Sequence, residues 1–235
     1  MERIEDLQRD GLKIIQDTDK FMFGTDSVLL ANFAKIKKNQ KVLDIGTGTG
    51  IITFLMYGRH KNANYTAIDI QKEMIEMANR SKALNGIENI EFIHTDLKDF
   101  DKKEYFDVVV CNPPYEKLGT GFTNGNDAIL QSRYEISATL QDIIACAKNS
   151  LKSNGKLFMI YKAERIAELA NVLTSANLEL KGIQPIVKNA VTPPRLILIE
   201  AIKGGHLGVK WHEPIIMYDE NGQLTNQVRS IYNAG

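Results

Sequence analysis

Residues 41–50 read Lys-Val-Leu-Asp-Ile-Gly-Thr-Gly-Thr-Gly, and the largely apolar run 51–55 follows directly. The first half of this stretch predicts a buried strand. The glycines predict a turn that adopts positive φ and lets backbone pass close to a ligand, and the apolar run predicts the start of a helix. The turn is not the dinucleotide fingerprint, because its third glycine follows the second by two residues instead of three.

The rest of the chain continues this alternation. We predict strands at 65–70, 89–94, 105–111 and 156–160, and helices at 71–85, 139–150 and 163–175. Repeated strand–helix units join parallel strands through right-handed crossovers, which gives a doubly wound sheet with helices on both faces. Two more strands, 178–186 and 196–202, have only a short loop between them, so we expect them to pair antiparallel.

The predicted fold is therefore an α/β, Rossmann-like sheet of seven strands, mostly parallel, with an antiparallel C-terminal strand. No internal repeat or linker divides the chain, so residues 1–235 are interpreted as a single domain. Within it we distinguish an N-terminal extension with a first helix (1–40), a doubly wound core (41–203) and a C-terminal tail (204–235).

Composition sets broad limits on function. The chain has 235 residues, 43% of them hydrophobic, and a formal net charge of zero. No global field favours a polyanionic partner, although a local basic face can still contact phosphates. The two cysteines, Cys111 and Cys146, lie in apolar patterns typical of a reducing compartment. With no signal peptide or membrane span in sight, we expect a cytoplasmic protein that needs neither a membrane nor a metal.

The strand at 105–111 ends at Asn112-Pro113-Pro114-Tyr115. Two prolines cannot continue a central strand, because each fixes φ and removes a backbone donor. A carboxamide and an aromatic ring are thus held on a stiff turn at the carboxyl end of a strand, where open α/β sheets bind ligands. This arrangement suits gripping a planar amino group; the alternative is a turn whose asparagine only caps the strand.

Acidic residues end three other predicted strands. Asp44 precedes the glycines, Asp69 lies at the end of the second strand, and Asp96 with Leu97 lies at the end of the third. Asp69 stands where a carboxylate can accept both hydroxyls of a ribose, and an acid beside an apolar side chain suits an adenine ring. Each acid alone could simply cap a helix. Together with Asn112 they indicate a nucleoside ligand across one rim of the sheet.

The pattern Asp44-x-Gly46-x-Gly48-x-Gly50, Asp69, Asp96 and Asn112 to Tyr115 resembles class I S-adenosylmethionine (AdoMet) methyltransferases that modify exocyclic nitrogens. More narrowly, the chain resembles bacterial tRNA(Val) adenine-N6 methyltransferases, which act on the adenine beside the anticodon. The similarity runs almost end to end, through 23–31, 42–52, 107–115 and 200–205. The chain departs from that family at Tyr134, where the family carries a histidine.

This resemblance implies AdoMet as cofactor and tRNA as partner. It places the glycine loop near the methionine part of AdoMet, the second acid on the ribose, the third at adenine, and the Asp26 stretch over the methionine end. The cofactor-binding residues expected on this basis are Asp26, Asp44, Gly46, Gly48, Gly50, Asp69, Ile70, Asp96, Leu97 and Asn112.

The same turn predicts the catalytic residues. The N6 amino group of adenine is a poor nucleophile, because its lone pair is delocalised into the ring. Two acceptors, the Asn112 side-chain oxygen and the Pro113 backbone carbonyl, would favour a pyramidal nitrogen and gain strength as it becomes positive. Tyr115 would stack on the target base.

Candidate RNA contacts are spread more widely. Residues 116–133 are rich in glycine and small polar residues and are interpreted as a loop over the base. The RNA-binding candidates are Phe122 and Arg133 within this loop, together with Arg195 and Lys203 among the basic residues late in the chain. A solvated, charge-balanced surface is the alternative for each of them.

Three alternatives stay open from the sequence. The Asn-Pro-Pro-aromatic turn also fits enzymes that methylate guanine N2 in rRNA or glutamine N5 in release factors, because the grip on a planar amino or amide group is alike. An NAD-dependent oxidoreductase is disfavoured by the glycine spacing. A non-catalytic RNA-binding module is disfavoured by the intact Asp44, Asp69 and Asn112.

Overall fold

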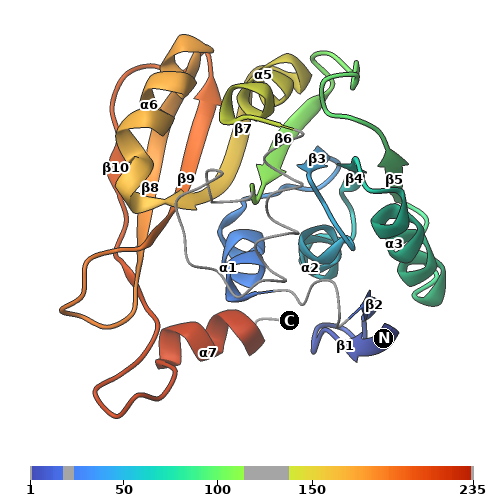
Figure 1. Ribbon diagram of the computed structural model, residues 1–235, viewed down its shortest axis with the longest axis horizontal. Coiled ribbons are helices and arrows are strands. Elements are labelled where there is room, and N and C mark those ends of the chain that lie inside the picture. The colour runs from blue at the N-terminus through green and yellow to red at the C-terminus, as the bar shows by residue number, and fades with distance from the viewer. Residues whose placement is uncertain (1, 18–23, 114–137, 234–235) are drawn as a thin grey trace.

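The computed structural model describes residues 2–17, 24–113 and 138–233. A large mixed sheet runs through the molecule, with helices on both faces (Figure 1). Tyr115, Phe122, Arg133 and the proposed loop at 116–133 lie outside the described residues, so their predicted roles stay predictions.

Seven strands form the body of the sheet and confirm the predicted fold class. In chain order they are β3 (Lys41–Ile45), β4 (Asn64–Asp69), β5 (Ile90–His94), β6 (Phe106–Cys111), β7 (Leu151–Lys162), β8 (Leu178–Val187) and β9 (Leu196–Lys203). Their spatial order is β8-β9-β7-β6-β3-β4-β5. Strands β3 to β7 pair in parallel, whereas β9 is antiparallel to both β7 and β8, as the short loop before it predicts.

Alternate residues of the central strands divide the core into two layers. Along β6, Val108 and Val110 face one hydrophobic cluster, whereas Val109 and Cys111 face the other. The first cluster packs against α1 (Thr25–Phe33), α2 (Ile51–Arg59), α3 (Lys72–Leu84) and α7 (Asn226–Asn233), and the second against α5 (Leu140–Ser150) and α6 (Ile166–Ser175), which follows the 3-10 turn η1 (Ala163–Arg165). Burial on both faces explains why these strands are almost wholly apolar.

Helix α5 begins with a capping box at Thr139. The Asp142 N–H donates to the Thr139 hydroxyl oxygen at 3.2 Å, and the Thr139 N–H donates to the Asp142 carboxylate at 2.9 Å. This reciprocal pair satisfies two of the donors that a helix start leaves open. It also fixes the entry of the helix beside the carboxyl end of β6, where Ala138 and Ile143 reach the site described below.

An N-terminal hairpin is a feature that sequence reasoning missed. Strands β1 (Glu2–Asp6) and β2 (Lys13–Asp17) pair antiparallel and lie against α3. The Asn85 carboxamide accepts from the Lys13 N–H at 2.8 Å and donates to the Lys13 carbonyl at 2.6 Å. The Ile15 N–H donates to the Ser81 hydroxyl oxygen at 2.9 Å. Polar side chains of the helix thus take the place of a third strand.

The segment predicted as a C-terminal tail adds two short strands and a helix. Strands β10 (Lys210–Trp211) and β11 (Ile215–Ile216) both pair in parallel with β8 and bring the sheet to nine strands within the described part of the chain. Helix α7 then returns to the N-terminal part of the chain, where the Tyr232 hydroxyl donates to the Thr25 hydroxyl oxygen at 2.9 Å. The buried guanidinium of Arg9 donates to the Ile231 carbonyl at 3.0 Å.

Candidate functional site

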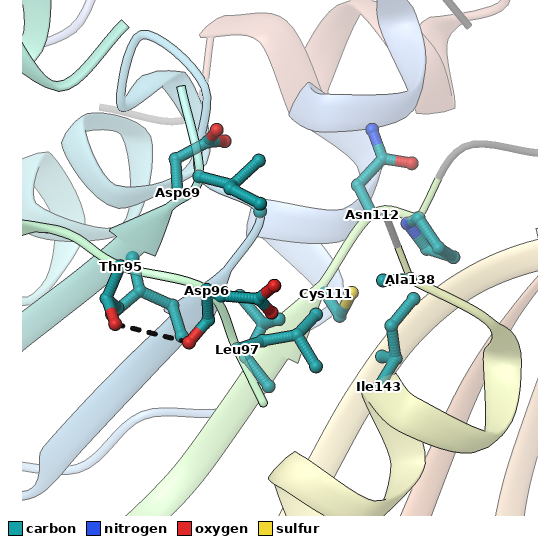
Figure 2. A pocket seen from close by; sticks show the side chains of 13 residues that line it. Asp69, Thr95, Asp96, Leu97, Cys111, Asn112, Ala138 and Ile143 are labelled. Atoms are coloured by element: carbon teal, nitrogen blue, oxygen red, sulfur yellow. Dashed lines mark hydrogen bonds between the residues drawn. The ribbon is translucent and has the colours of Figure 1, made fainter. Parts of the chain in front are cut away.

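A cavity opens at the carboxyl ends of β3, β4 and β6 (Figure 2). Of the predicted site residues it brings together Gly46, Asp69, Ile70, Asp96, Leu97, Asn112 and Pro113. Its lining also includes residues that the sequence reasoning did not single out, namely Ile45, Ile68, Thr95, Cys111, Ala138 and Ile143. Three of the four predicted polar strand ends, those with Asp69, Asp96 and Asn112, therefore line one cavity, whereas Asp44 does not.

Asp69 links the two neighbouring strand ends. The side chain is almost wholly buried, and its Oδ2 accepts the Gly48 N–H at 2.8 Å while its Oδ1 accepts the Gln71 N–H at 2.8 Å. The Ile68 carbonyl accepts the N–H groups of Gly46 and Thr47 at 2.9 and 3.0 Å. The glycine loop is consequently tied to the end of β4, with a carboxylate held at the cavity wall.

The glycines of this loop serve two different purposes. Gly46 and Gly48 have φ of 71° and 55°, and a Cβ added at either would meet no atom of the described residues within 4 Å. The backbone is thus open to an approaching ligand at these two positions. Gly50 has φ of 87°, and a Cβ there would lie 2.8 Å from the Phe92 ring, so this glycine permits close packing at the start of α2.

Asp44 lies behind the loop. It is 1% exposed, and its Oδ2 accepts from the hydroxyls of Thr47 and Thr53, each at 2.7 Å. Its Oδ1 is buried with no hydrogen-bond partner among the described residues. Asp44 is not among the residues that line the cavity, so its connection to the site runs through Thr47 and the loop. Thr53, a hydroxyl in an otherwise apolar helix start, was the signal that sequence reasoning overlooked.

Two titratable groups beside the cavity have strongly shifted pKa values. Burial raises the pKa of Asp44 from its ordinary value of 3.8 to about 6, and the Asp69 carboxylate adds to this, whereas the hydroxyls of Thr47 and Thr53 lower it. Burial and then the neighbouring Asp44 raise the pKa of the Cys111 thiol well above its ordinary value. Cys111 therefore contributes an uncharged, apolar wall, and Asp44 changes charge near pH 6.

The Thr53→Val substitution is expected to destabilise the folded protein most when the Asp44 carboxyl group is ionised. Between about pH 4 and pH 6 the folded protein holds a proton on Asp44 that the unfolded chain has lost. The free energy of unfolding therefore falls as pH rises through that window. Removing the Thr53 hydroxyl moves the pKa still higher. We expect a loss of about 1.5–3 kcal/mol at pH 8 and about 1 kcal/mol at pH 5, measured by urea unfolding.

Two further variants control this prediction. Thr53→Ser keeps the hydroxyl and should return most of the stability that Thr53→Val removes at pH 8. Asp44→Asn removes the titrating carboxylate, so the difference between Thr53→Val and its parent should no longer depend on pH in that background. A Thr53→Val penalty equal at pH 5 and pH 8 in the otherwise unchanged protein would show that the hydroxyl does not act on the Asp44 charge.

The opposite walls of the cavity differ in character. Figure 2 shows Asp69 and Asn112 on opposite sides, with Asp96 and Leu97 between them. The Asp96 Oδ1 accepts the Lys98 N–H at 2.9 Å, which fixes this carboxylate in a tight turn after β5. Leu97 belongs with Ala138, Cys111 and Ile143 to an apolar surface. The cavity thus combines acceptors on its rim with an apolar slot, as planar heterocyclic ligands require.

Asp26 lies apart from this lining. It is in the first turn of α1, half-buried, and the helix is capped by Gly24 without a side-chain hydrogen bond. The first helix predicted within residues 1–40 is present as α1, but Asp26 is not among the residues that line the cavity.

Arg195 and Lys203 lie at the two ends of β9, at opposite edges of the sheet. Because β9 is antiparallel to β7, the end with Arg195 lies at the edge where β7 ends. Arg195 is exposed beside the carboxyl end of β7, where its carbonyl accepts the Ala163 N–H at 3.0 Å. Lys203 pairs with Leu178 at the other edge. Its amine donates to the Leu151 carbonyl at 2.7 Å and to Glu104 at 3.1 Å, and only 11% of its side chain is exposed. Arg195 thus shares the cavity's edge, whereas Lys203 anchors strands far from it.

Two negative findings concern the described part of the chain. Nowhere in 2–17, 24–113 and 138–233 do three His, Cys, Asp or Glu side chains come together in a way that could hold a metal ion. None of the helices in these ranges combines the length and apolar character needed to cross a membrane.

Comparisons with known sequences point to one reaction class. Residues 36–209 match a family model described as a methyltransferase domain. Relatives named tRNA1(Val) (adenine(37)-N6)-methyltransferase include those of Aliivibrio salmonicida, 28% identical over 58% of each chain, and Parabacteroides distasonis, 29% identical over 75% of each chain. That of Haemophilus influenzae is 27% identical over 90% of each chain. The first alignment thus spans less than two thirds of the relative's length and the other two span more.

Solved structures agree on the fold. A predicted O-methyltransferase from Agrobacterium tumefaciens superposes with a TM-score of 0.72 at 23% identity, covering 88% of this chain and 95% of that one. TYW2 of M. jannaschii, crystallised in complex with AdoMet, gives a TM-score of 0.60 at 16% identity, covering 86% and 85%. Because the family model spans most of the sequence and the cavity lies where it was predicted, the chain belongs to the methyltransferase domain family.

Proposed function

We propose that this protein transfers a methyl group from AdoMet to the exocyclic N6 of an adenine in tRNA, beside the anticodon of a valine tRNA. The observation that supports it best is the single cavity that joins the glycine loop, Asp69, Asp96 and Asn112. The relatives' names supply the substrate, which the cavity alone does not specify.

The residues present fit AdoMet. Open backbone at Gly46 and Gly48 suits the methionine part, and Asp69 stands at the wall where ribose hydroxyls would donate. Asp96 would accept from the amino group of the adenine moiety, and the apolar slot at Leu97 would cover the ring. When bound, the cofactor supplies an electrophilic methyl group on a sulfonium sulfur. Ile70, 40% exposed at the cavity edge, would flank the ribose.

Asn112 and Pro113 would orient the target amino group. The Asn112 side-chain oxygen and the Pro113 carbonyl would each accept a hydrogen bond from one of the two N6 hydrogens. The lone pair of the nitrogen would then be directed into the cavity. Both acceptors bind the developing positive charge more strongly than the neutral amine, which stabilises the transition state selectively. Proline holds them in place without reorganisation. Tyr115, outside the described residues, is proposed to stack on the base.

An adenine in an anticodon loop suits such a site. The target base must leave its stack to reach Asn112, and a loop base costs less to extrude than a paired one. Since tRNA is a cytoplasmic molecule in bacteria, we propose the cytoplasm as the place of action, with the whole chain working as one domain.

Incubation with unmodified total tRNA and labelled AdoMet, followed by nucleoside analysis, tests the proposal. We expect the label in N6-methyladenosine, and mainly in valine tRNA. A transcript with guanine at the target position is the matched control and should take up no label. Label in guanosine, or in protein when release factors are supplied, would contradict the assignment to adenine N6.

A further inference from the structure

The loop between β8 and β9, residues 188–195, lies at the same edge of the sheet as the cavity. Strand β8 ends at Val187, and the paired residues Ile186 and Leu196 mark where the chain turns back. Leu196 also pairs with Lys162, the last residue of β7. We call residues 188–195 the β8–β9 loop.

The β8–β9 loop is held by its own hydrogen bonds. The Asn189 side-chain oxygen accepts the N–H groups of Val191 and Thr192 at 3.2 and 3.1 Å. The Thr192 hydroxyl oxygen accepts the Asn189 N–H and donates to the Asn189 carbonyl, both at 3.2 Å. Two prolines then restrict the approach to β9. A loop closed on itself in this way needs no partner to hold its shape.

This rigid loop presents an apolar tip between two cations. Val191 is 89% exposed, the most among the large hydrophobic side chains described. Lys188 and Arg195 are exposed at the two ends of the loop, and neither makes an ion pair with a described carboxylate. Residues 184–199 contain no Asp or Glu. The loop itself therefore carries two cations and no carboxylate, on a chain with no net charge.

Strand order places these cations in a row that starts at the cavity. Asn112 follows β6, Lys162 ends β7, Arg195 precedes β9 and Lys188 follows β8, and these four strands are consecutive in the sheet. Neighbouring strands lie about 4.8 Å apart, so Arg195 and Lys188 stand roughly 10 and 15 Å from Asn112 along the edge. Lys162, the nearest, is partly neutralised by Glu164 at 4.0 Å.

We propose that the β8–β9 loop binds the sugar–phosphate backbone of the RNA substrate next to the base held at Asn112. Lys188 and Arg195 contact phosphates, and Val191 packs on the sugar between them. A nucleic-acid strand is a row of negative charges, and spaced cations on a rigid edge match it without ordering a flexible segment. This inference rests on the proposed function, since it assigns the surface that binds its substrate.

The double variant Lys188→Gln and Arg195→Gln tests the assignment in the full chain. We expect the Kd for valine tRNA to rise about tenfold, and the slope of log Kd against log salt concentration to fall by about one for each phosphate that the variant no longer neutralises. AdoMet affinity and kcat at saturating tRNA should stay close to those of the unmodified protein. Val191→Ser, which keeps both cations, should weaken binding without changing the salt slope.

A charge-matched control uses the opposite edge of the sheet. Lys37 and Lys38 are exposed just before the amino end of β3, and changing both to Gln removes the same charge. We expect this control to bind tRNA as the unmodified protein does. Equally weakened binding in the two double variants, or an unchanged salt slope in the loop variant, would overturn the proposal while N6 methylation by the unmodified protein still stands. If the unmodified protein neither binds nor methylates tRNA, the proposed function itself fails.

Discussion

Asn112→Ala is expected to lower kcat with saturating tRNA and AdoMet by about 10²–10³-fold, while the Kd for AdoMet stays near that of the unmodified protein. Asn112 stands on the cavity wall opposite Asp69, away from the residues assigned to the ribose (Figure 2). The hydrogen bond that its side-chain oxygen accepts becomes stronger as the amine becomes positive. Removing this oxygen therefore affects the transition state more than substrate binding. Single-turnover rates and AdoMet titration separate the two effects.

Asn112→Asp makes this test sharper. The aspartate keeps an acceptor oxygen at the same place, so the acceptor mechanism predicts more residual turnover than in the alanine variant. Ile143→Val, which trims the apolar wall of the same cavity, controls for changes in its shape and should leave kcat within a few-fold of normal. Equal turnover in Asn112→Ala and the unmodified protein would refute the mechanism.

Asp69→Ala should instead weaken cofactor binding. The buried carboxylate accepts the Gly48 and Gln71 N–H groups and stands where ribose hydroxyls would donate. Hydrogen bonds to a charged group contribute about 1.5–3 kcal/mol each. Removing even one of them corresponds to an AdoMet Kd higher by about ten- to a hundredfold. Calorimetric titration of AdoMet measures this directly, and kcat at saturating cofactor should fall much less.

Asp99, exposed in the turn after β5, offers a control for net charge. Asp99→Ala also removes one negative charge after β5 but leaves the cavity wall intact. Its AdoMet affinity should match that of the unmodified protein. An Asp69→Ala variant with the same affinity as Asp99→Ala would remove Asp69 from the site. Folding of both is checked by thermal unfolding, because the Asp69 carboxylate also holds the glycine loop.

The features predicted well from the sequence are those that depend on short stretches. Apolar β-branched runs specify buried strands, and glycines at every second position, Gly46, Gly48 and Gly50, specify the loop after β3. Neither pattern depends on the rest of the chain. The rim at Asp69, Asp96 and Asn112 follows from the same logic, since the carboxyl ends of parallel strands share one edge.

The features that were missed depend on distant partners. Strand β1, Glu-Arg-Ile-Glu-Asp, is too charged to predict a strand, and the hairpin is held by Asn85 and Ser81, more than sixty residues further along the chain. Strands β10 and β11 have two residues each, too few for any periodicity. The hydrogen bond that the Asp44 carboxylate accepts from Thr53 forms only when the folded helix α2 brings the two side chains together.

Lys203 shows an inference that the sequence did permit. The two ends of a strand lie at opposite edges of the sheet, so Arg195 and Lys203 cannot both border the cavity. The antiparallel direction of β9 places Arg195 at the cavity's edge. Within the related C-terminal stretch, Glu200 is buried and accepts from Lys156 at 2.6 Å, with Lys35 at 3.6 Å. Glu200 thus ties β9 to β7 and to the chain just after α1, and that packing role explains its presence without any RNA contact.

The contacts between the N-terminal part and α7 set an order for synthesis on the ribosome. Arg9 leaves the ribosome early, yet the carbonyl to which its guanidinium donates belongs to Ile231. The hydroxyl that donates to Thr25 likewise belongs to a late residue, Tyr232. Chains fold as they are made, from the N-terminal side. Until translation has passed α7, a nascent chain can hold the whole sheet but lacks the partners of Arg9 and Thr25. It also lacks Val228 and Ile231, which belong to the core cluster on that face of the sheet. A premature stop codon shortly before that point should therefore yield a protein that is readily degraded, although every residue of the cavity has been made.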